Sequence, residues 1–475
     1  MSTGGASGLE GGVNRRLLLA VLISAVFVAV MNSSMVNVAV PVIRRDFGAS
    51  EAQVGWVITS YLLIYAVGIP LYGRAADVFS LRSAFSLGLL VFAVGSLVSA
   101  LAPSLPLLVF GRIVQATGAA AIPALSSASV AKVLPPGDRG TALGLIVSSV
   151  GVGAAVGPVV GGVIQEFAGW QSLFYATLAL TLLLLPGALY VLPKTESSED
   201  RSFDVVGGVL LGLAAGLFLF GITQGQTYGF GAASSWGSFV VSALTAAGFA
   251  WRITSAAHPF VSPALFSNPP YVAAVVVGFF SMLVNVSCLV SVPLLVSQVN
   301  GLGPAATGFV LAPGAIALAI LSPLAGRLSD RIGVKTLIYT GLTAMLASVL
   351  FLSAFAAGAS PFVVATGMLG IGVGFALTNS PNVNAAAAAL EEKESGVGLG
   401  IFNGLFFLGG GTGPAVVGAF LAARREAEAE AINPLYSLGA APFSDAFLLL
   451  GVALVVCLVA ARWVRNGAGG EKREA

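Results

Sequence analysis

The chain has 475 residues, of which 57% are hydrophobic and only 9% are charged, with a formal net charge of +2. A soluble domain carries about 25% charged residues, and a mean hydropathy of +0.96 excludes soluble, disordered and fibrous proteins. The apolar runs are continuous rather than alternating, which excludes a transmembrane β-barrel. A polytopic helical membrane protein remains, and the small net charge gives no indication of a nucleic-acid partner.

Taken in chain order, the sequence predicts fourteen membrane-spanning helices. A span needs about 20 apolar residues, and charged or Pro/Gly-rich breaks separate the runs. The predicted spans are residues 17–42, 53–72, 84–101, 106–130, 141–167, 172–192, 205–224, 236–253, 271–299, 306–328, 336–357, 361–388, 396–422 and 443–464. The seventh and eighth spans stand between two sets of six, and the eighth is short.

The basic residues are sorted between the two sides of these spans. With the N-terminus in the cytoplasm, 17 of the 22 Lys and Arg residues fall in inner loops and tails, and four fall in outer loops. The last, Arg112, lies within a span. This excess is what the positive-inside rule requires. The sequence therefore predicts a multi-pass protein of the plasma (inner) membrane, surrounded by lipid, with both termini cytoplasmic. We expect it to act as a monomer.

Two motifs occur twice. Gly73-Arg74-Ala75-Ala76-Asp77 follows the second span, and Gly326-Arg327-Leu328-Ser329-Asp330 lies 253 residues later. Glycines 144, 153 and 157 of the fifth span recur 256 residues later in the thirteenth. The repeats predict an all-α fold of two six-helix bundles plus an inserted helix pair, and such repeats are typical of carriers that rock one half against the other around a central site. The predicted segments are a disordered tail at 1–14, bundles at 15–194 and 259–465, the pair with its linkers at 195–258, and a tail at 466–475.

These residues resemble the major facilitator superfamily over nearly the whole chain. Asn37-Val38-Ala39-Val40-Pro41 and Arg112-Ile113-Val114-Gln115-Ala116-Thr117-Gly118 are similar to signatures of its fourteen-helix drug:proton antiporter branch, which includes tetracycline exporters. The motif of exporting antiporters is matched by Gly144, Gly153, Gly157, Pro158, Gly161 and Gly162. The resemblance implies a secondary transporter that exports small amphipathic compounds or drugs by alternating access, without a cofactor, and leaves proton coupling open.

Each motif has a physical interpretation. The glycines leave one helix face without side chains, so that a neighbouring helix can pack closely, and Pro158 removes a backbone donor and favours a kink. In the repeated loop, we expect Arg82 to bind a carboxylate across the interface of the two halves and to release it as the carrier rocks. The residues predicted to gate the inner side are Gly73, Asp77, Arg82, Gly326, Asp330 and Lys335.

Arg112 is the basic side chain that the prediction places at depth. A charge there costs about 2.5–3.5 kcal/mol on insertion scales unless it faces a cavity or a partner, so we interpret Arg112 as a functional residue. The alternative is a structural arginine bonded to backbone carbonyls. Gln115 lies one turn on and shares its face. The polar residues predicted to line a substrate cavity are Asn32, Ser33, Asn37, Arg112, Gln115, Asn285, Asn379 and Asn382.

The sequence departs from the branch in its acidic residues. Most of the branch carries Asp at the position of Asn32, and the tetracycline exporters carry further acids at the positions of Ser33, Ala154 and Gly410. All 20 Asp and Glu residues here fall in loops, tails or at span ends, whereas a proton relay usually needs Asp, Glu or His. The frame of an exporter therefore lacks the usual proton carrier.

Three accounts of coupling stay open. Protons bind at span ends, at Asp46, Glu51 or Glu166; or the substrate carries the proton or a negative charge, with Arg112 as its counter-ion; or the carrier is not coupled. The second is favoured, because an uncompensated cation in a dry cavity attracts anionic or polarisable ligands.

Two other classes of protein compete with an exporter. The first is a facilitative or uptake carrier for an anionic or neutral metabolite. The intact glycine motif argues against it, and the absence of acidic residues within the spans argues for it. An enzyme is excluded, because one histidine and two distant cysteines, Cys288 and Cys457, provide no catalytic or metal-binding cluster. A primary pump is excluded by the lack of a phosphate-binding Gly-rich loop.

Overall fold

The computed structural model describes residues 14–49, 51–193, 204–256, 259–302, 304–391, 394–426, 430–433 and 440–465. Within these ranges it has fourteen α-helices and no strand. The helices are α1 (Arg15–Asp46), α2 (Glu51–Val78), α3 (Leu81–Ala100), α4 (Leu105–Val133), α5 (Pro136–Ala168), α6 (Gln171–Val191), α7 (Val205–Tyr228), α8 (Ala233–Ser255), α9 (Pro269–Gln298), α10 (Pro304–Ile332), α11 (Val334–Phe355), α12 (Pro361–Ala388), α13 (Ser395–Glu426) and α14 (Ala441–Ala460).

Each predicted span coincides with one of these helices. Of the helices in the described ranges, twelve are long and apolar enough to cross a membrane, and α5 and α8 are not among them. Several helices run past their apolar segment: α1 ends at Asp46 and α13 at Glu426. Charged side chains at a helix end can reach water while the backbone stays helical, so apolar runs locate the spans but not the helix ends. The predicted tails fall on 1–13 and 466–475, outside the described residues, apart from Asn14, which caps α1.

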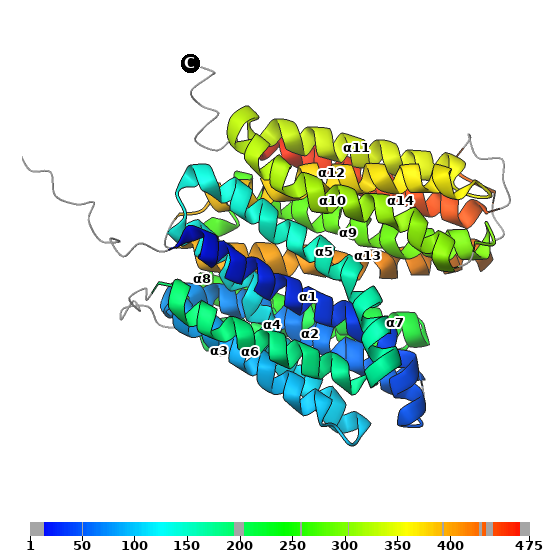
Figure 1. The fold of residues 1–475 in the computed structure, drawn as a ribbon. Helices are drawn as coiled ribbons and strands as arrows, with labels where there is room; N and C mark the ends of the chain where they lie inside the picture. Colours follow the sequence, from blue (N-terminus) through cyan, green and yellow to red (C-terminus); the bar gives the residue numbers. More distant parts are fainter. Residues whose placement is uncertain are drawn as a thin grey trace, which may run out of the picture.

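The helices form two bundles with the same internal order of contacts (Figure 1). In the first bundle α3 packs on α4 and α6, and α1 packs on α5; in the second, α11 packs on α12 and α14, and α9 packs on α13. This confirms the predicted fold of two repeated six-helix bundles. The inserted helices α7 and α8 pack on each other, and α7 also lies against α2 and α13, one helix from each bundle.

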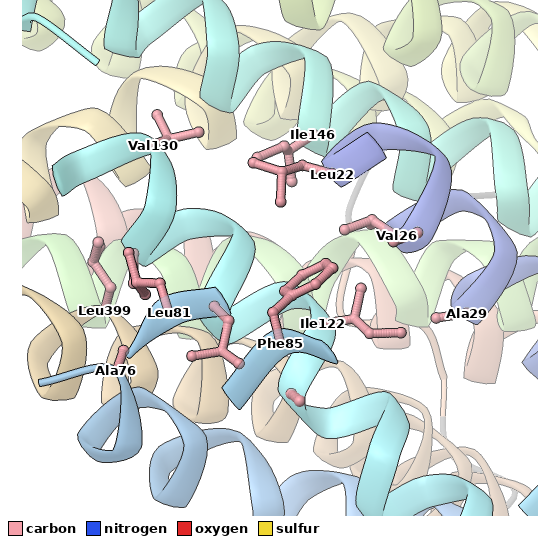
Figure 2. Packing of buried hydrophobic residues seen from close by; sticks show 14 of the residues in the cluster. Leu22, Val26, Ala29, Ala76, Leu81, Phe85, Ile122, Val130, Ile146 and Leu399 are labelled. Carbon is pink, nitrogen blue, oxygen red and sulfur yellow. The ribbon is translucent and has the colours of Figure 1, made fainter. Parts of the chain in front are cut away.

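Close packing fills the middle of the first bundle. Leu22 of α1, Phe85 of α3 and Ile122 of α4 are fully or almost fully buried in one cluster, which Leu399 of α13 joins from the second bundle (Figure 2). Lipid tails are as apolar as leucine, so in a bilayer such a core is stabilised by van der Waals packing more than by removal from water.

An ion pair with a buried carboxylate holds the inserted helices together. The Asp204 carboxylate accepts hydrogen bonds from the backbone N–H groups of Gly207 (3.1 Å) and Phe260 (3.2 Å), and it pairs with Arg252 of α8 (3.1 Å). Asp204 therefore caps α7, holds the end of α8, and binds the segment that leads to α9. Burial raises the pKa of the Asp204 carboxyl, but the hydrogen bonds and the charge of Arg252 outweigh burial, so the pKa is lower than usual.

Asp204→Asn is expected to destabilise the protein by about 2 kcal/mol, the scale for hydrogen bonds to a charged group. Because the carboxyl pKa is lowered in the folded state, its contribution is present above the unfolded value of about 3.9 and is lost as pH falls through the folded value. Thermal unfolding of the two proteins between pH 7 and pH 3 measures this. A difference in melting temperature that is the same across the range would contradict it.

Candidate functional site

A buried polar network surrounds Arg112 in the first bundle. Its Nη1 donates to Asn32 Oδ1 (3.1 Å) and Gln115 Oε1 (2.6 Å), and its Nε donates to the carbonyl oxygen of Val57 (3.1 Å). The guanidinium carbon lies 4.0 Å from the centroid of the Tyr61 ring, a cation–π contact. Arg112 is only 1% exposed. Its charge therefore meets amide and carbonyl oxygens and the face of a ring.

Two further bonds extend the network to α3 and α6. Asn32 Nδ2 donates to Thr177 Oγ1 (2.9 Å), and Gln115 Nε2 donates to Ser96 Oγ (2.7 Å). All of these side chains are buried. Each amide gives its oxygen to Arg112 and its nitrogen to a hydroxyl, so the network assigns both amide orientations. It joins helices α1, α2, α3, α4 and α6, and it lies inside the first bundle.

The structure brings Asn32, Arg112 and Gln115 together but sets the other predicted cavity residues apart from them. On α1, Ser33 is half-buried and Asn37 is exposed. Asn285 repeats Asn32 at an offset of 253 residues, but Ala365 stands at that offset from Arg112. In the described part of the second bundle, the position that repeats Arg112 therefore holds no cation.

Three predicted asparagines lie in the second bundle. Asn285 of α9 is 8% exposed, and Asn379 and Asn382 of α12 are 4% and 0% exposed. Asn382 Nδ2 donates to the carbonyl oxygen of Ala274 (2.8 Å). Among the described residues, Oδ1 of Asn379 and Oδ1 of Asn382 have no hydrogen-bond partner. Because an unpaired buried acceptor is costly, these oxygens are suited to accept a hydrogen bond from a ligand.

Glycines of the repeated motifs form the contacts between the bundles. A Cβ on Gly73 of α2 would lie 2.5 Å from Gly400 Cα and 2.7 Å from the carbonyl oxygen of Gly396 of α13. On the other pair of helices, a Cβ on Gly144 of α5 would lie 2.6 Å from the carbonyl oxygen of Ser322 of α10, and Gly326 meets Gly140 in the same way. Backbones can approach this closely only where side chains are absent.

Both glycine contacts lie near one face of the molecule. We call the face at which α1 begins the N side and the opposite face the far side. The contacts involve the N-side halves of α2, α5, α10 and α13, and Ser148 Oγ adds a hydrogen bond from α5 to the carbonyl oxygen of Ala319 (2.7 Å). Figure 1 shows the bundles together at the N side and diverging toward the far side. This arrangement is closed at the N side.

The rest of the glycine motif packs inside each bundle. A Cβ on Gly157 of α5 would lie 2.9 Å from the carbonyl oxygen of Met31, and one on Gly161 would lie 2.9 Å from Met35 Cα, both in α1. Gly153 faces the same helix, and Gly413 faces α9 in the second bundle. Gly162 has nothing within 4 Å of its Cβ position. The predicted glycine face therefore exists without Gly162, and α5 continues as helix through Pro158, whose side chain lies outside the described residues.

Arg82 and Lys335, the basic residues at the end of each repeated loop, bind their own bundles. Arg82 Nε donates to the carbonyl oxygen of Leu192 at the end of α6 (2.6 Å), and Lys335 Nζ donates to that of Arg462 just after α14 (2.9 Å). The expectation that Arg82 binds a carboxylate of the other half is thus corrected. Unpaired carbonyls at a helix C-terminus carry partial negative charge and attract a cation. The side chains of Asp77 and Asp330 lie outside what the structure describes.

Two tyrosines that sequence reasoning missed, Tyr61 and Tyr65, extend from Arg112 toward Phe407 of the second bundle, a residue that the sequence did suggest as an apolar contact for substrate. Tyr61 stacks on Tyr65, one turn along α2, with ring centroids 5.8 Å apart. Tyr65 meets Phe407 of α13 edge to face, with centroids 5.4 Å apart. The spacing of four residues places both tyrosines on one face of α2, which is the signal that could have found them. Their partners belong to other helices and leave no mark in the local pattern.

The acidic residues of the described helices all lie within five residues of a helix end. Asp46 accepts a hydrogen bond from Trp170 Nε1 (2.8 Å), Asp138 pairs with Arg15 (2.8 Å), and Asp445 pairs with Arg424. In the described part of the chain, no three His, Cys, Asp or Glu side chains gather as metal ligands would. These helices therefore carry a cation near the middle of the first bundle and no carboxylate at that depth.

Comparison with known proteins agrees with this architecture. Residues 22–414 and 274–475 match the family described as Major Facilitator Superfamily. The chain is 30% identical over 417 residues to the multidrug resistance protein Stp of Mycobacterium tuberculosis, covering 86% of this chain and 77% of Stp. It is 28% identical over 420 residues to the tetracenomycin C resistance and export protein of Streptomyces glaucescens, covering 88% and 78%.

Two further likenesses concern a transporter of stated substrate and a solved structure. The riboflavin transporter RibZ of Clostridioides difficile is 25% identical over 384 residues, covering 80% of this chain and 83% of RibZ. The crystal structure of the human organic anion transporter MFSD10 superposes with a TM-score of 0.66 at 15% identity, covering 93% of this chain and 99% of that one, which shows the fold. The chain belongs to the Major Facilitator Superfamily and is a membrane transporter, not an enzyme.

Proposed function

We propose that this transporter is a secondary exporter of small amphipathic compounds that works by alternating access. The observation that carries the proposal is the pair of glycine contacts that joins the two bundles at the N side while they diverge at the far side. A carrier of this kind exposes its site to one side of the membrane and then to the other. Relatives named for multidrug resistance and for export support this direction of transport.

We assign the N side to the cytoplasm and both termini with it. The loops at this side carry most of the basic residues, as the positive-inside rule requires. The conformation described here is then outward-facing. Export needs a second conformation in which the α2–α13 and α5–α10 contacts open, so that a compound from the cytoplasm or the inner leaflet can reach the interior.

The substrate is proposed to be neutral or anionic. Arg112 carries a charge that two amides and a carbonyl solvate, and the described helices offer no carboxylate at its depth. Charge interactions are stronger in such a low-dielectric interior than in water, so an organic cation is disfavoured there. For an anionic substrate, the negative charge of the substrate itself, rather than a protonated side chain, couples export to the membrane potential. A potential of 100 mV supplies about 2.3 kcal/mol per charge.

Everted membrane vesicles test the direction and the coupling together. With fluorescein as an anionic probe, we expect accumulation in energised vesicles that persists when nigericin collapses the pH gradient and falls when valinomycin collapses the potential. Vesicles without the transporter are the control. Accumulation that stops with the pH gradient alone would replace this account by proton coupling through a group at a helix end.

A facilitative or uptake carrier is the second candidate. The amide at Asn32, where most of the branch has an acid, favours it, and one relative is named a riboflavin transporter. Right-side-out vesicles distinguish the two. When these vesicles are energised, an uptake carrier would bring the internal concentration of its substrate up to or above the external one, whereas the exporter would keep it below.

A further inference from the structure

The ring contact between Tyr65 and Phe407 stands at the boundary between the closed and the open parts of the interface. Tyr65 is the fifteenth of 28 residues in α2, and Phe407 lies near the middle of α13. On their N side, α2 and α13 are in contact through Pro70 and Gly404 and then through Gly73 and Gly400. One turn toward the far side, Leu62 of α2 is 48% exposed. The two rings therefore lie where buried positions give way to exposed ones along the α2–α13 seam.

Among the stacked rings that the structure describes here, Tyr65 and Phe407 are the most exposed. Behind Tyr65 lies Tyr61, which is 2% exposed; behind Phe407 lie Phe406 and Phe402, which are 7% and 1% exposed. Tyr65 and Phe407 themselves are half-buried. The neighbouring face of α4 changes in the same place, because Ala120 is fully buried and Thr117, one turn nearer the far side, is exposed.

Alternating access must part these rings, because they come from opposite bundles. An aromatic pair is worth about 0.5–1.5 kcal/mol beyond its area, and that contribution is lost when α2 and α13 separate. A planar ring inserted between Tyr65 and Phe407 would replace the lost stabilisation with one aromatic contact to each of the two rings. An aliphatic group of similar size would fill the space without the edge-to-face geometry.

The charge of the surroundings selects among aromatic compounds. The guanidinium of Arg112 lies 4.0 Å from the centroid of the Tyr61 ring, and Tyr61 in turn stacks on Tyr65. A cationic ring on Tyr65 would meet this field, and no carboxylate of the described helices lies at that depth to offset it. A neutral or anionic ring is favoured by the same field.

We propose that Tyr65 and Phe407 form an aromatic recognition site, and that the substrates are compounds with a planar, neutral or anionic aromatic group. This proposal rests on the proposed export function, because only a transporter would make the bound compounds its substrates. The existence of the aromatic site can be tested by binding alone, without transport. Tyr61 positions Tyr65 and connects it to Arg112, and Phe406 holds Phe407 edge to face at 5.3 Å.

Equilibrium binding to the purified full-length protein tests the site without any gradient. Fluorescence polarisation is measured for fluorescein, a planar anion, and for ethidium, a planar cation, with octanoate as a ringless anionic competitor. We expect fluorescein to bind about tenfold or more tightly than ethidium, a difference of 1.4 kcal/mol, and octanoate not to displace it. Equal binding of the two dyes, or displacement by octanoate, would overturn the proposal.

Variants of the two rings provide the second arm. Tyr65→Leu and Phe407→Leu are each expected to weaken fluorescein binding by about threefold to tenfold, the value of one aromatic pair, whereas Tyr65→Phe keeps it. Tyr190→Leu removes a tyrosine that is 78% exposed on α6 and serves as the matched control. Unchanged binding in both leucine variants would overturn the proposal. If a leucine variant does not fold, fluorescein binding by Tyr65→Phe and the comparison of the two dyes on the wild-type protein still test the aromatic site.

The outcome separates this inference from the exporter proposal. Ring-selective binding without accumulation in everted vesicles would retain the site and refute export. Accumulation combined with binding that is indifferent to rings would retain export and refute the site.

Discussion

Gly73→Val is expected to lower export of fluorescein by roughly 5- to 150-fold, the range that about 1–3 kcal/mol of overpacking corresponds to. The added side chain would meet backbone atoms of Gly400 and Gly396, which cannot rotate away. The N-side contact would then form poorly, and the population would shift toward the conformation that is open at the N side. Gly326→Val should act in the same direction, because it meets the backbone of Gly140.

Gly55→Val is the matched control for this prediction. Gly55 lies on the same helix, and nothing is within 4 Å of its Cβ position. Vesicle accumulation and thermal unfolding of both variants separate a conformational bias from a failure to fold. If Gly73→Val exports at the wild-type rate, the glycine contact is not the closing element.

Arg112→Leu is expected to abolish binding and export of fluorescein and to lower the melting temperature. The substitution leaves Asn32 Oδ1 and Gln115 Oε1 buried without their donor, at about 1–3 kcal/mol each. Arg112→Lys should not restore binding, because a point charge cannot reach the three acceptors of Arg112 and the Tyr61 face together. Full binding and export in Arg112→Leu would show that the charge of Arg112 is not needed for either.

Asn32→Asp separates the charge of the network from its structure. It keeps the size of the side chain and adds a carboxylate where Asn32 Oδ1 now lies 3.1 Å from Arg112 Nη1. We expect the variant to fold, to prefer fluorescein over ethidium less strongly, and to export with a pH dependence that the wild type lacks. An unchanged preference between the two dyes would show that the charge of Arg112 does not select substrates.

The helices and the repeat could be predicted from the sequence, because both depend on local patterns. Runs of about 20 apolar residues mark a span wherever they occur, and Gly157 and Gly413 revealed two copies of one packing face. Gln115 lies one turn from Arg112 and was expected on the same helix face. It accepts a hydrogen bond from Arg112 and donates one to Ser96. Such spacing within a single helix is legible in a sequence.

The partners across helices could not be predicted in the same way. Tyr61 contacts Arg112, and Arg82 binds the carbonyl oxygen of Leu192. In each case the partner lies at the same level along the axis of a neighbouring helix. Nothing in the spacing of α2, α3 or α4 records this. The carboxylate expected for Arg82 was a reasonable partner by charge, but a helix C-terminus offers a similar attraction without an acidic residue.

Alternating access is tested most directly by distances between spin labels on both sides of the molecule. One pair, at Phe79 and Ile332, reports on the N side, and the other, at Leu101 and Phe355, reports on the far side; all four residues are exposed and flank equivalent helices of the two bundles. Cys288 and Cys457 are first replaced by alanine. We expect fluorescein to lengthen the N-side distance and to shorten the far-side distance in the same fraction of molecules. Two distances that stay fixed, or that change in the same direction, would contradict it.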